Sequence, residues 1–397
     1  MFFKRVYAKI TAIFLLPLIL LSLMSFSVFA ESGDTPTDSD GIQKVDLALE
    51  CKSAILMEAT TGNILYEQNA DEALPPASVT KVMTLLLVME AIEEGKITLS
   101  DTVRTSAHAA AMGGSQIYLK EGEEMSVEDM LKSVIIASAN DAACALAEHV
   151  AGSEEAFVKK MNEKAAELGM KNTSFENTNG LDDTTENHYT SARDIAIMSR
   201  ELIKHEKILE YSSIWMDTVR NGMFGLTNTN RLVRFYRGCT GLKTGSTSKA
   251  GFCVSATAER DGVSLICVIM GAESGDKRNA MASKLLDYGF ANYGVYKYEP
   301  EALENLKVTG GISESVKIEA ETFSCMLEKG KISKIQYKIE LPESVPAPIK
   351  RGDKDGEIVY SCDGGEIGRT EILATEDIRK IGFFELWWRM LAKFLLK

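Results

Sequence analysis

Three short motifs in this chain place a serine hydroxyl and lysine amines at spacings that suit acyl transfer. They are Ser78-Val79-Thr80-Lys81, Ser138-Ala139-Asn140 and Lys243-Thr244-Gly245. A serine hydroxyl is a weak nucleophile until a neighbouring base accepts its proton. A lysine three residues further along a helix lies on the same face as the serine. Ser78 is therefore predicted to be the nucleophile and Lys81 its general base.

The first motif gains its weight from its context, because Ser-x-x-Lys also occurs at Ser246 to Lys249 and at Ser274 to Lys277. Only the copy at Ser78 follows a Pro-Pro-Ala sequence and precedes an apolar run, 79–92, that is rich in helix-forming residues. The Ser-x-Asn and Lys-Thr-Gly motifs each occur once and follow it in order. Ser78 is therefore expected to open a buried helix.

Lys81 is a base only in its neutral form. An unperturbed lysine has a pKa of about 10.4, so its surroundings must lower that value by roughly three units. Burial and a second nearby cation both have this effect, and Lys243 is the candidate for the second cation. The four histidines are scattered and have no acidic partner at motif spacing. A Ser-His-Asp triad is therefore the poorer hypothesis.

The other two motifs are expected to handle the substrate. Ser138 and Asn140 fall between two helical patterns, where a loop projects both side chains into a cleft. We expect Ser138 to relay a proton towards the leaving amine and Asn140 to hydrogen-bond the substrate amide. Lys243-Thr244-Gly245 is expected to begin a strand at a sheet edge. There Gly245 lets a substrate backbone approach closely, and the two side chains before it hold a carboxylate.

This combination of motifs resembles the penicillin-recognising serine enzymes. Within them the chain is most similar to the low-molecular-mass penicillin-binding proteins that act as D-alanyl-D-alanine carboxypeptidases. The resemblance runs from about residue 45 to residue 372. Beyond the three motifs it rests on Pro75 to Ala77, Gly180-Leu181-Asp182, Ser191-Ala192-Arg193-Asp194 and Gly238 to Leu242.

The resemblance implies a reaction and a set of partners. Ser78 attacks the penultimate carbonyl of a peptidoglycan stem peptide ending in D-Ala-D-Ala, the terminal D-Ala leaves, and water hydrolyses the acyl-enzyme. No metal or organic cofactor is implied, and β-lactam antibiotics are expected to acylate the same serine. The resemblance also implies oxyanion donors at the backbone amides of Ser78 and Ser246. It places Arg278 near the terminal carboxylate, and the alternative for Arg278 is a solvated loop arginine.

Two rival functions were weighed against this one. A class A β-lactamase needs a Glu-x-x-x-Asn motif before Lys243, and the candidate glutamates lack the asparagine: Glu163, Glu167, Glu176 and Glu186. A wall-binding scaffold without catalysis is disfavoured because the three motifs are intact. Endopeptidase action on cross-links would use the same site as the carboxypeptidase reaction.

The N-terminus predicts export. Residues 1–30 combine three basic residues, an apolar stretch and a Val-Phe-Ala cleavage sequence, which is typical of a signal peptide; a membrane-spanning anchor is the alternative. Residues 31–44 are polar and turn-prone and read as a flexible spacer. Without the three basic residues of the leader, 41 Lys and Arg remain of 44 against 57 Asp and Glu, so the net charge is near −16. Nucleic-acid binding is therefore not expected.

The remaining pattern predicts an α+β fold of the β-lactamase/transpeptidase type, with an antiparallel sheet covered by helices, over residues 45–298. Its hairpin is expected at 53–57 and 64–66, its helices between 79 and 203, and two apolar strands at 252–258 and 263–270. Short alternating segments from 306 to 374 predict a small β-sandwich without a catalytic cluster.

The chain ends in an expected amphipathic helix, 377–397, with a wide apolar face and paired tryptophans. It is too short and too charged for a comfortable span, so we expect it to lie in the membrane surface; packing on the protein itself is the alternative. The predicted location is the outer face of the bacterial cytoplasmic membrane, with peripheral attachment. The seven cysteines show no metal-binding spacing and are expected to be mostly reduced, although Cys253 and Cys267 lie in strands that could bridge.

Overall fold

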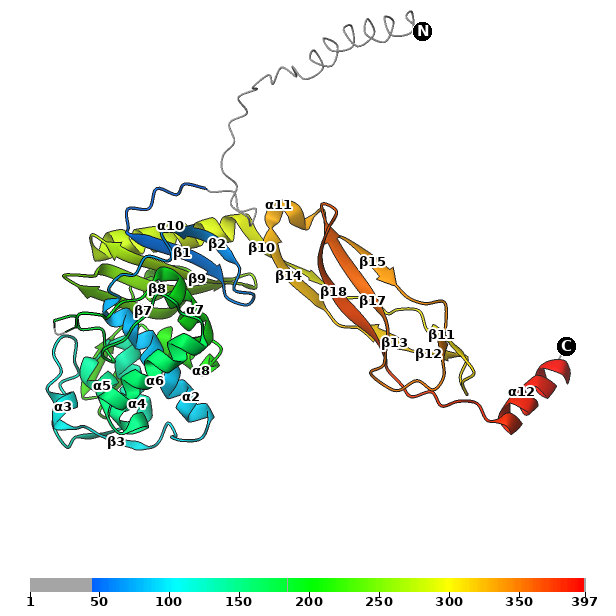
Figure 1. Cartoon of the computed structure of the whole chain (residues 1–397), viewed down its shortest axis with the longest axis horizontal. Helices are drawn as coiled ribbons and strands as arrows, with labels where there is room; N and C mark the ends of the chain where they lie inside the picture. Colours follow the sequence, from blue (N-terminus) through cyan, green and yellow to red (C-terminus); the bar gives the residue numbers. More distant parts are fainter. Residues whose placement is uncertain (1–44, 184, 396–397) are drawn as a thin grey trace, which may run out of the picture. The chain divides into compact units, whose positions relative to one another are not determined.

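The computed structural model describes residues 45–183 and 185–395 (Figure 1). The signal peptide predicted for residues 1–30 and the spacer predicted for residues 31–44 lie outside the described residues. We therefore describe the peptidase region, the C-terminal β region and the final helix, each by itself.

A five-stranded sheet forms the centre of the peptidase region. Its strands are β1 (Ser53–Glu58), β2 (Ile64–Gln68), β7 (Cys239–Thr247), β8 (Gly251–Arg260) and β9 (Val263–Ala272). Their order is β2-β1-β9-β8-β7, and all neighbours pair antiparallel. The predicted hairpin and the two apolar strands are confirmed. The β1–β2 hairpin pairs with β9, so strands from both ends of the region share one sheet.

Helices cover both faces of this sheet (Figure 1). On one face α10 (Gly275–Asn292) packs on β1, β8 and β9, and on the other α7 (Ala192–Leu202) packs on β1 and β9. Side chains alternate between the two faces along each strand. Ile55 accordingly belongs to the core around α7, whereas its neighbour Leu56 belongs to the core around α10.

The same alternation corrects one prediction. Cys253 lies in the core on the α7 side of the sheet, and Cys267 lies in the core on the α10 side. Two thiols on opposite faces cannot form a disulfide without moving the strands. All seven cysteines, which lie within the described residues, are unpaired.

The helical part between the strands contains α2 (Lys81–Glu93), α3 (Ala107–Ala110), α4 (Val127–Ile136), α5 (Asn140–Ala151), α6 (Glu154–Glu167), α7, α8 (Glu206–Ser212) and α9 (Leu232–Phe235). α2 is buried along most of its length, in agreement with its apolar sequence on all sides. Two small hairpins, β3 (Thr102–Arg104) with β4 (Glu124–Ser126) and β5 (Met216–Val219) with β6 (Phe224–Thr227), were not predicted.

The C-terminal region is built from β strands, as predicted. One sheet holds β11 (Leu306–Thr309), β12 (Ser315–Val316) and β16 (Val345–Pro346); the other holds β13 (Ile318–Ala320), β15 (Gln336–Glu340), β17 (Lys354–Cys362) and β18 (Gly365–Ala374). A further strand, β10 (Tyr293–Tyr298), pairs antiparallel with β14 (Phe323–Glu328). Tyr360 lies at the centre of the core and stacks on Phe323, with ring centroids 3.9 Å apart.

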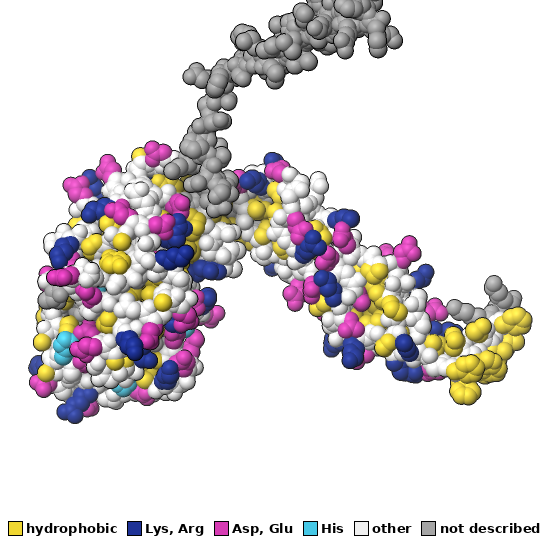
Figure 2. Space-filling model, viewed as in Figure 1, with side chains coloured by type: hydrophobic (Ala, Val, Ile, Leu, Met, Phe, Trp, Pro, Cys, Tyr) yellow, Lys and Arg dark blue, Asp and Glu magenta, His cyan; other side chains and the backbone are white. Residues whose placement is uncertain are grey.

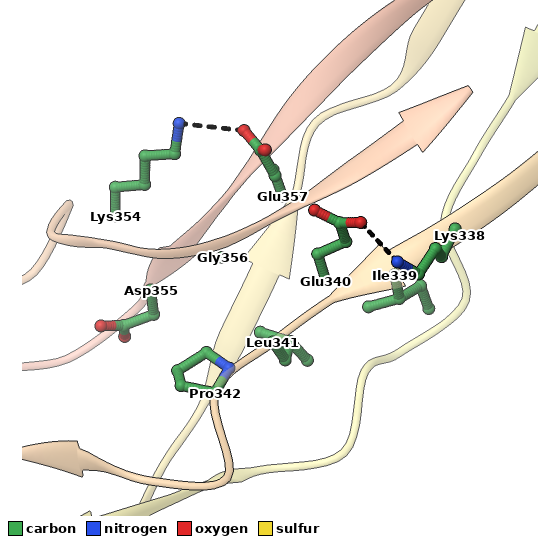
Figure 3. A pocket seen from close by; sticks show the side chains of 9 residues that line it. All are labelled: Lys338, Ile339, Glu340, Leu341, Pro342, Lys354, Asp355, Gly356 and Glu357. Carbon is green, nitrogen blue, oxygen red and sulfur yellow. Dashed lines mark hydrogen bonds and ion pairs between the residues drawn. The ribbon is translucent and has the colours of Figure 1, made fainter. Parts of the chain in front are cut away.

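A shallow pocket in this region lies between the end of β15 and the start of β17 (Figure 3). Its lysines are paired with its glutamates: Lys338 Nζ lies 2.7 Å from Glu340, and Lys354 Nζ lies 3.3 Å from Glu357. The pocket therefore offers no unpaired cation and no nucleophile among its lining side chains.

The expected C-terminal helix is present as α12 (Phe383–Leu395). Residues just before it are extended, and Ile378 forms a β-bridge with Ile349. Figure 2 shows hydrophobic side chains over most of the visible surface of α12. No helix among the described residues is both long enough and apolar enough to cross a bilayer.

Candidate active site

Ser78 and Lys81 are in contact, as their spacing predicted. Lys81 Nζ donates to Ser78 Oγ over 2.9 Å. Ser78 does not open the α-helix, however: it lies in a single 3₁₀ turn, η1 (Ala77–Thr80), and α2 begins at Lys81. Tight 3₁₀ turns are common at helix N-termini. In this turn Ser78 is half-buried, whereas Lys81 at the start of α2 is fully buried.

The surroundings of Lys81 lower its basicity in the way its role requires. Burial, and next the neighbouring Lys243 cation, hold the pKa of Lys81 well below its ordinary range, against an opposing effect of Asp141. Lys243 thus lies close enough to Lys81 to act as the second cation that the sequence predicts. Burial, together with Arg278, lowers the pKa of Lys243 itself to about 7.

β7 passes directly beside the nucleophile. A Cβ atom on Gly245 would lie 2.7 Å from the Ser78 backbone nitrogen and 2.9 Å from the Pro76 carbonyl oxygen, so any other residue would push the strand away. β7 is the last strand of the sheet, which leaves its outer edge without a strand partner, and Ser246 is exposed there. The Lys-Thr-Gly motif lies in the middle of β7 rather than at its start, because pairing with β8 already begins at Cys239.

Ser138 and Asn140 lie at the junction of α4 and α5, as predicted. Ser138 is buried. Its φ of +62° is a left-handed backbone conformation, which residues other than glycine adopt at a cost of about 1–2 kcal/mol. Asn140 Nδ2 donates to the Gly113 carbonyl over 2.7 Å. Its buried Oδ1 has no hydrogen-bond partner among the described residues. This oxygen is therefore free to accept a hydrogen bond.

Arg278 places a second positive charge near Lys243. Arg278 lies on α10 with 7% of its surface exposed, and donates to the Cys253 carbonyl over 3.4 Å. It is therefore buried, and the alternative of a solvated loop arginine is wrong. Thr244 Oγ1 donates to Thr229 Oγ1 over 2.9 Å, which fixes the threonine next to Lys243.

A loop at residues 177–182 completes the site, although no local signal in the sequence gave it a role. The Asn179 carbonyl accepts the second hydrogen bond of Lys81 Nζ, over 2.8 Å. Gly180 has a φ of +85°, and a Cβ there would lie 1.8 Å from the Ala77 carbonyl oxygen. Thr247 Oγ1 donates to Asp182 Oδ2 over 2.5 Å and so ties the loop to β7.

Asp141 is a second residue whose function was missed. Its fully buried carboxylate accepts hydrogen bonds from the backbone N–H groups of Ile117, Leu119 and Ala142. These bonds fix the 113–119 segment, whose Gly113 carbonyl in turn holds Asn140.

The buried His188 contacts Thr80, the residue before Lys81. Its Nε2 lies 2.8 Å from Thr80 Oγ1, and its Nδ1 accepts a hydrogen bond from the Glu176 N–H.

Comparison with known proteins decides the family. The family model for D-alanyl-D-alanine carboxypeptidases matches residues 40–274, and the model for the C-terminal domain of penicillin-binding protein 5 matches residues 296–380. This chain belongs to the D-alanyl-D-alanine carboxypeptidase family. Among curated relatives of this carboxypeptidase is DacF of Bacillus subtilis, which is 46% identical over 352 residues and covers 87% of this chain and 90% of the relative.

Solved structures agree with this assignment. A penicillin-binding protein 3 from Streptococcus pneumoniae shares 32% identity with this carboxypeptidase, with a TM-score of 0.71 over 83% of this chain and all of that one. Penicillin-binding protein D2 from Listeria monocytogenes, solved in its ampicillin-bound form, shares 33% identity, with a TM-score of 0.57 over 62% of this chain and all of that one. The carboxypeptidase is thus a penicillin-binding serine peptidase of the low-molecular-mass type.

Proposed function

We propose that Ser78 carries the carboxypeptidase reaction with neutral Lys81 as its base. The Lys81 amine accepts the hydroxyl proton while Ser78 Oγ forms a bond to the penultimate carbonyl carbon of a D-Ala-D-Ala stem peptide. The 2.9 Å contact between Nζ and Oγ carries this assignment. Proton transfer requires such contact, and the lowered pKa of Lys81 leaves its amine able to take the proton.

The oxyanion is held by the backbone amides of Ser78 and Ser246. The close approach at Gly245 brings these two segments together and supports the pairing. Loss of one such donor typically costs about 3 to 4 kcal/mol of transition-state stabilisation. The substrate backbone lies along the free edge of β7, where Asn140 Oδ1 accepts from its amide N–H.

The terminal carboxylate is held by Lys243, Thr244 and Arg278. Lys243, Thr244 and Arg278 together offer cationic and hydroxyl groups that match a single carboxylate, and the buried position of Arg278 strengthens its attraction for that group. Ser138 relays the proton from Lys81 to the departing D-Ala nitrogen as the C–N bond breaks. Water then attacks the acyl-enzyme, Lys81 again takes a proton, and Ser78 is released.

Release of D-Ala from an N-acylated peptide ending in D-Ala-D-Ala tests this function. The wild-type chain releases D-Ala, and Ser78→Ala reduces the rate by about a thousandfold or more. A peptide ending in L-Ala-L-Ala is the control for stereochemistry and remains intact. Turnover by Ser78→Ala at a rate near that of the wild type overturns the assignment of the nucleophile.

The proposal places the enzyme at the outer face of the cytoplasmic membrane. Export follows from the leader at 1–30 and the spacer at 31–44, and the peptidase domain (45–298) and β-sandwich domain (306–374) precede the membrane helix within 377–397. On α12 the side chains of Phe383, Trp388 and Phe394 are between 67% and 81% exposed. Aromatic side chains of this kind favour the headgroup layer of a bilayer, which supports peripheral attachment. The acidic net charge argues against nucleic acid as a partner.

A further inference from the structure

Three possible metal ligands from three helices converge away from Ser78. They are His108 on α3, Cys144 on α5 and Glu154, the first residue of α6. One ligand atom from each lies within 4.8 Å of the other two. His108 Nε2 is already 2.7 Å from Glu154 Oε2. The sequence gave no sign of this cluster, because 36 and 10 residues separate its members.

The thiol of Cys144 is unusually placed for a core cysteine. It is fully buried in α5, where the neighbouring buried positions are alanine and leucine, yet it faces a carboxylate. A divalent cation between the sulfur and the carboxylate would replace the thiol proton.

A cation has a path to the cluster. His108 and Glu154 line a pocket of about 710 Å³ whose wall also includes Glu176 and Glu186. Its lining side chains comprise three carboxylates and one histidine, and no lysine or arginine. The pocket therefore attracts cations.

The carboxylate of Glu154 is held in a fixed orientation. Its Oε1 accepts from the Thr178 hydroxyl over 2.6 Å and from the Thr178 N–H over 3.1 Å. Its Oε2 is left to His108 and to a cation. Hydrogen bonds that orient a ligand in this way are typical of metal sites. Thr178 directly precedes Asn179, whose carbonyl holds Lys81.

We propose that His108 Nε2, Cys144 Sγ and Glu154 Oε2 bind a divalent zinc-type cation, with water from the pocket as the fourth ligand. One nitrogen, one thiolate and one carboxylate form a donor set that Zn²⁺ accepts in tetrahedral geometry. The thiol proton is released to solvent on binding. The His108 side chain is 53% exposed, so it is free to adjust its position to a bound cation. The cation joins α3, α5 and α6 behind the loop that positions Lys81, and takes no part in acyl transfer.

The test is metal binding by the full-length chain in detergent after chelator treatment. Zn²⁺ is titrated by calorimetry, and Co²⁺ is used as a spectroscopic probe because a thiolate ligand gives a charge-transfer band. His108→Asn and Cys144→Ala are the test variants. His205→Asn is a matched control, since His205 pairs with Glu93 over 2.6 Å and no third ligand joins them among the described residues. Cys267→Ala is the matched control for loss of a buried thiol.

The proposal predicts one Zn²⁺ per chain and a thiolate–cobalt band, both retained in the two controls. Each test variant weakens Zn²⁺ binding by about 10- to 100-fold or more, and Cys144→Ala abolishes the band. His108→Asn keeps the protein fold intact, because the side chain is largely exposed, so its result stands even if Cys144→Ala is unstable. Absence of stoichiometric Zn²⁺ binding by the wild type overturns the proposal, as does equal binding by His108→Asn.

Discussion

At the residue scale, the proposed reaction depends on two buried amines that both have a lowered proton affinity. Lys81 and Lys243 are both nearly inaccessible to solvent, and each has a lowered pKa. Burial favours the neutral form of an amine, and a second cation favours it further. The lowered pKa suits the role of base that we propose for Lys81, without help from a histidine.

The rate of acylation by benzylpenicillin is predicted to fall about tenfold per pH unit below the pKa of Lys81, since only its neutral amine accepts the Ser78 proton. Lys243→Gln removes a cation that lowers this pKa, so the ascending limb moves to higher pH. A limb that stays in place or moves to lower pH in Lys243→Gln contradicts the assignment of Lys81.

Asp141 gives a second prediction at this scale. Asp141→Ala leaves three buried backbone N–H groups without their acceptor, at about 1 kcal/mol or more for each. We expect the free energy of unfolding to fall by at least about 3 kcal/mol, and by less in Asp141→Asn, which keeps one oxygen. Urea unfolding measures both, with exposed Asp276→Ala as the control. Equal stability of Asp141→Ala and the wild type would show that the carboxylate is not structural.

The sequence was sufficient to predict the chemical groups of the site, but not the burial and hydrogen-bond partners of all of them. The spacing of Ser78 and Lys81 was sufficient to predict their contact, because three residues make about one helical turn. The burial of Arg278 was not predictable, since a charged stretch at a helix start looks the same whether one of its members points inward or not. The carboxylate of Asp141 was missed for a similar reason: two of its three partners, Ile117 and Leu119, lie 24 and 22 residues away.

At the element scale, the site exists because three backbone segments approach one another more closely than side chains allow. β7 passes η1 at Gly245, and the 177–182 loop passes η1 at Gly180. The strand supplies the substrate edge, the turn supplies the nucleophile, and the loop supplies the carbonyl that holds Lys81. A displacement of any of the three would separate groups that must touch.

Gly180→Ala is therefore predicted to reduce acylation by benzylpenicillin by a hundredfold or more, because a Cβ would lie 1.8 Å from the Ala77 carbonyl oxygen. The matched control is Gly152→Ala, whose φ of +87° is nearly the same but whose Cβ would meet nothing within 4 Å. The control carries only the conformational strain, about 1–2 kcal/mol of stability, and acylates normally. Equal acylation by both variants would contradict the close contact.

The strands β8 and β9 were predictable because both are apolar runs on either side of a tight turn. The position of Lys-Thr-Gly inside β7 was not predictable, because Gly238 and Gly241 are residues that usually interrupt a strand. In the structure β7 begins between these two glycines, and its pairing with β8 shifts in register between Cys239 and Gly241. The role of the 177–182 loop depends on contacts almost 100 residues apart in the chain, to which local patterns are blind.

At the scale of the whole molecule, the proposed catalytic groups and the proposed membrane helix belong to different parts of the chain. The catalytic groups all lie in the peptidase region, and the exposed aromatic side chains of α12 lie beyond the β strands. The hydrophobic pattern of the last residues was sufficient to predict this helix. The metal-ligand cluster, by contrast, appears only once the helices are folded together.

Removal of residues 383–397 is predicted to abolish binding to phospholipid vesicles while leaving the rate of benzylpenicillin acylation within about twofold of the wild type. The apolar area of α12 provides the membrane affinity, and no catalytic group is lost. Vesicle sedimentation measures binding, and Trp388→Glu in the full chain is expected to weaken it without any deletion. Full vesicle binding by the truncated chain would contradict the role of α12.

The central claim is that Ser78 forms the acyl-enzyme, and time-resolved intact mass of the full-length chain with benzylpenicillin tests it most directly. Ser78→Ala is compared with Ser274→Ala, which removes the serine of another Ser-x-x-Lys copy, where the hydroxyl caps α10. We predict one long-lived penicillin adduct on the wild type and on Ser274→Ala, and none on Ser78→Ala. An adduct on Ser78→Ala, or a wild type that leaves penicillin untouched, would contradict the account.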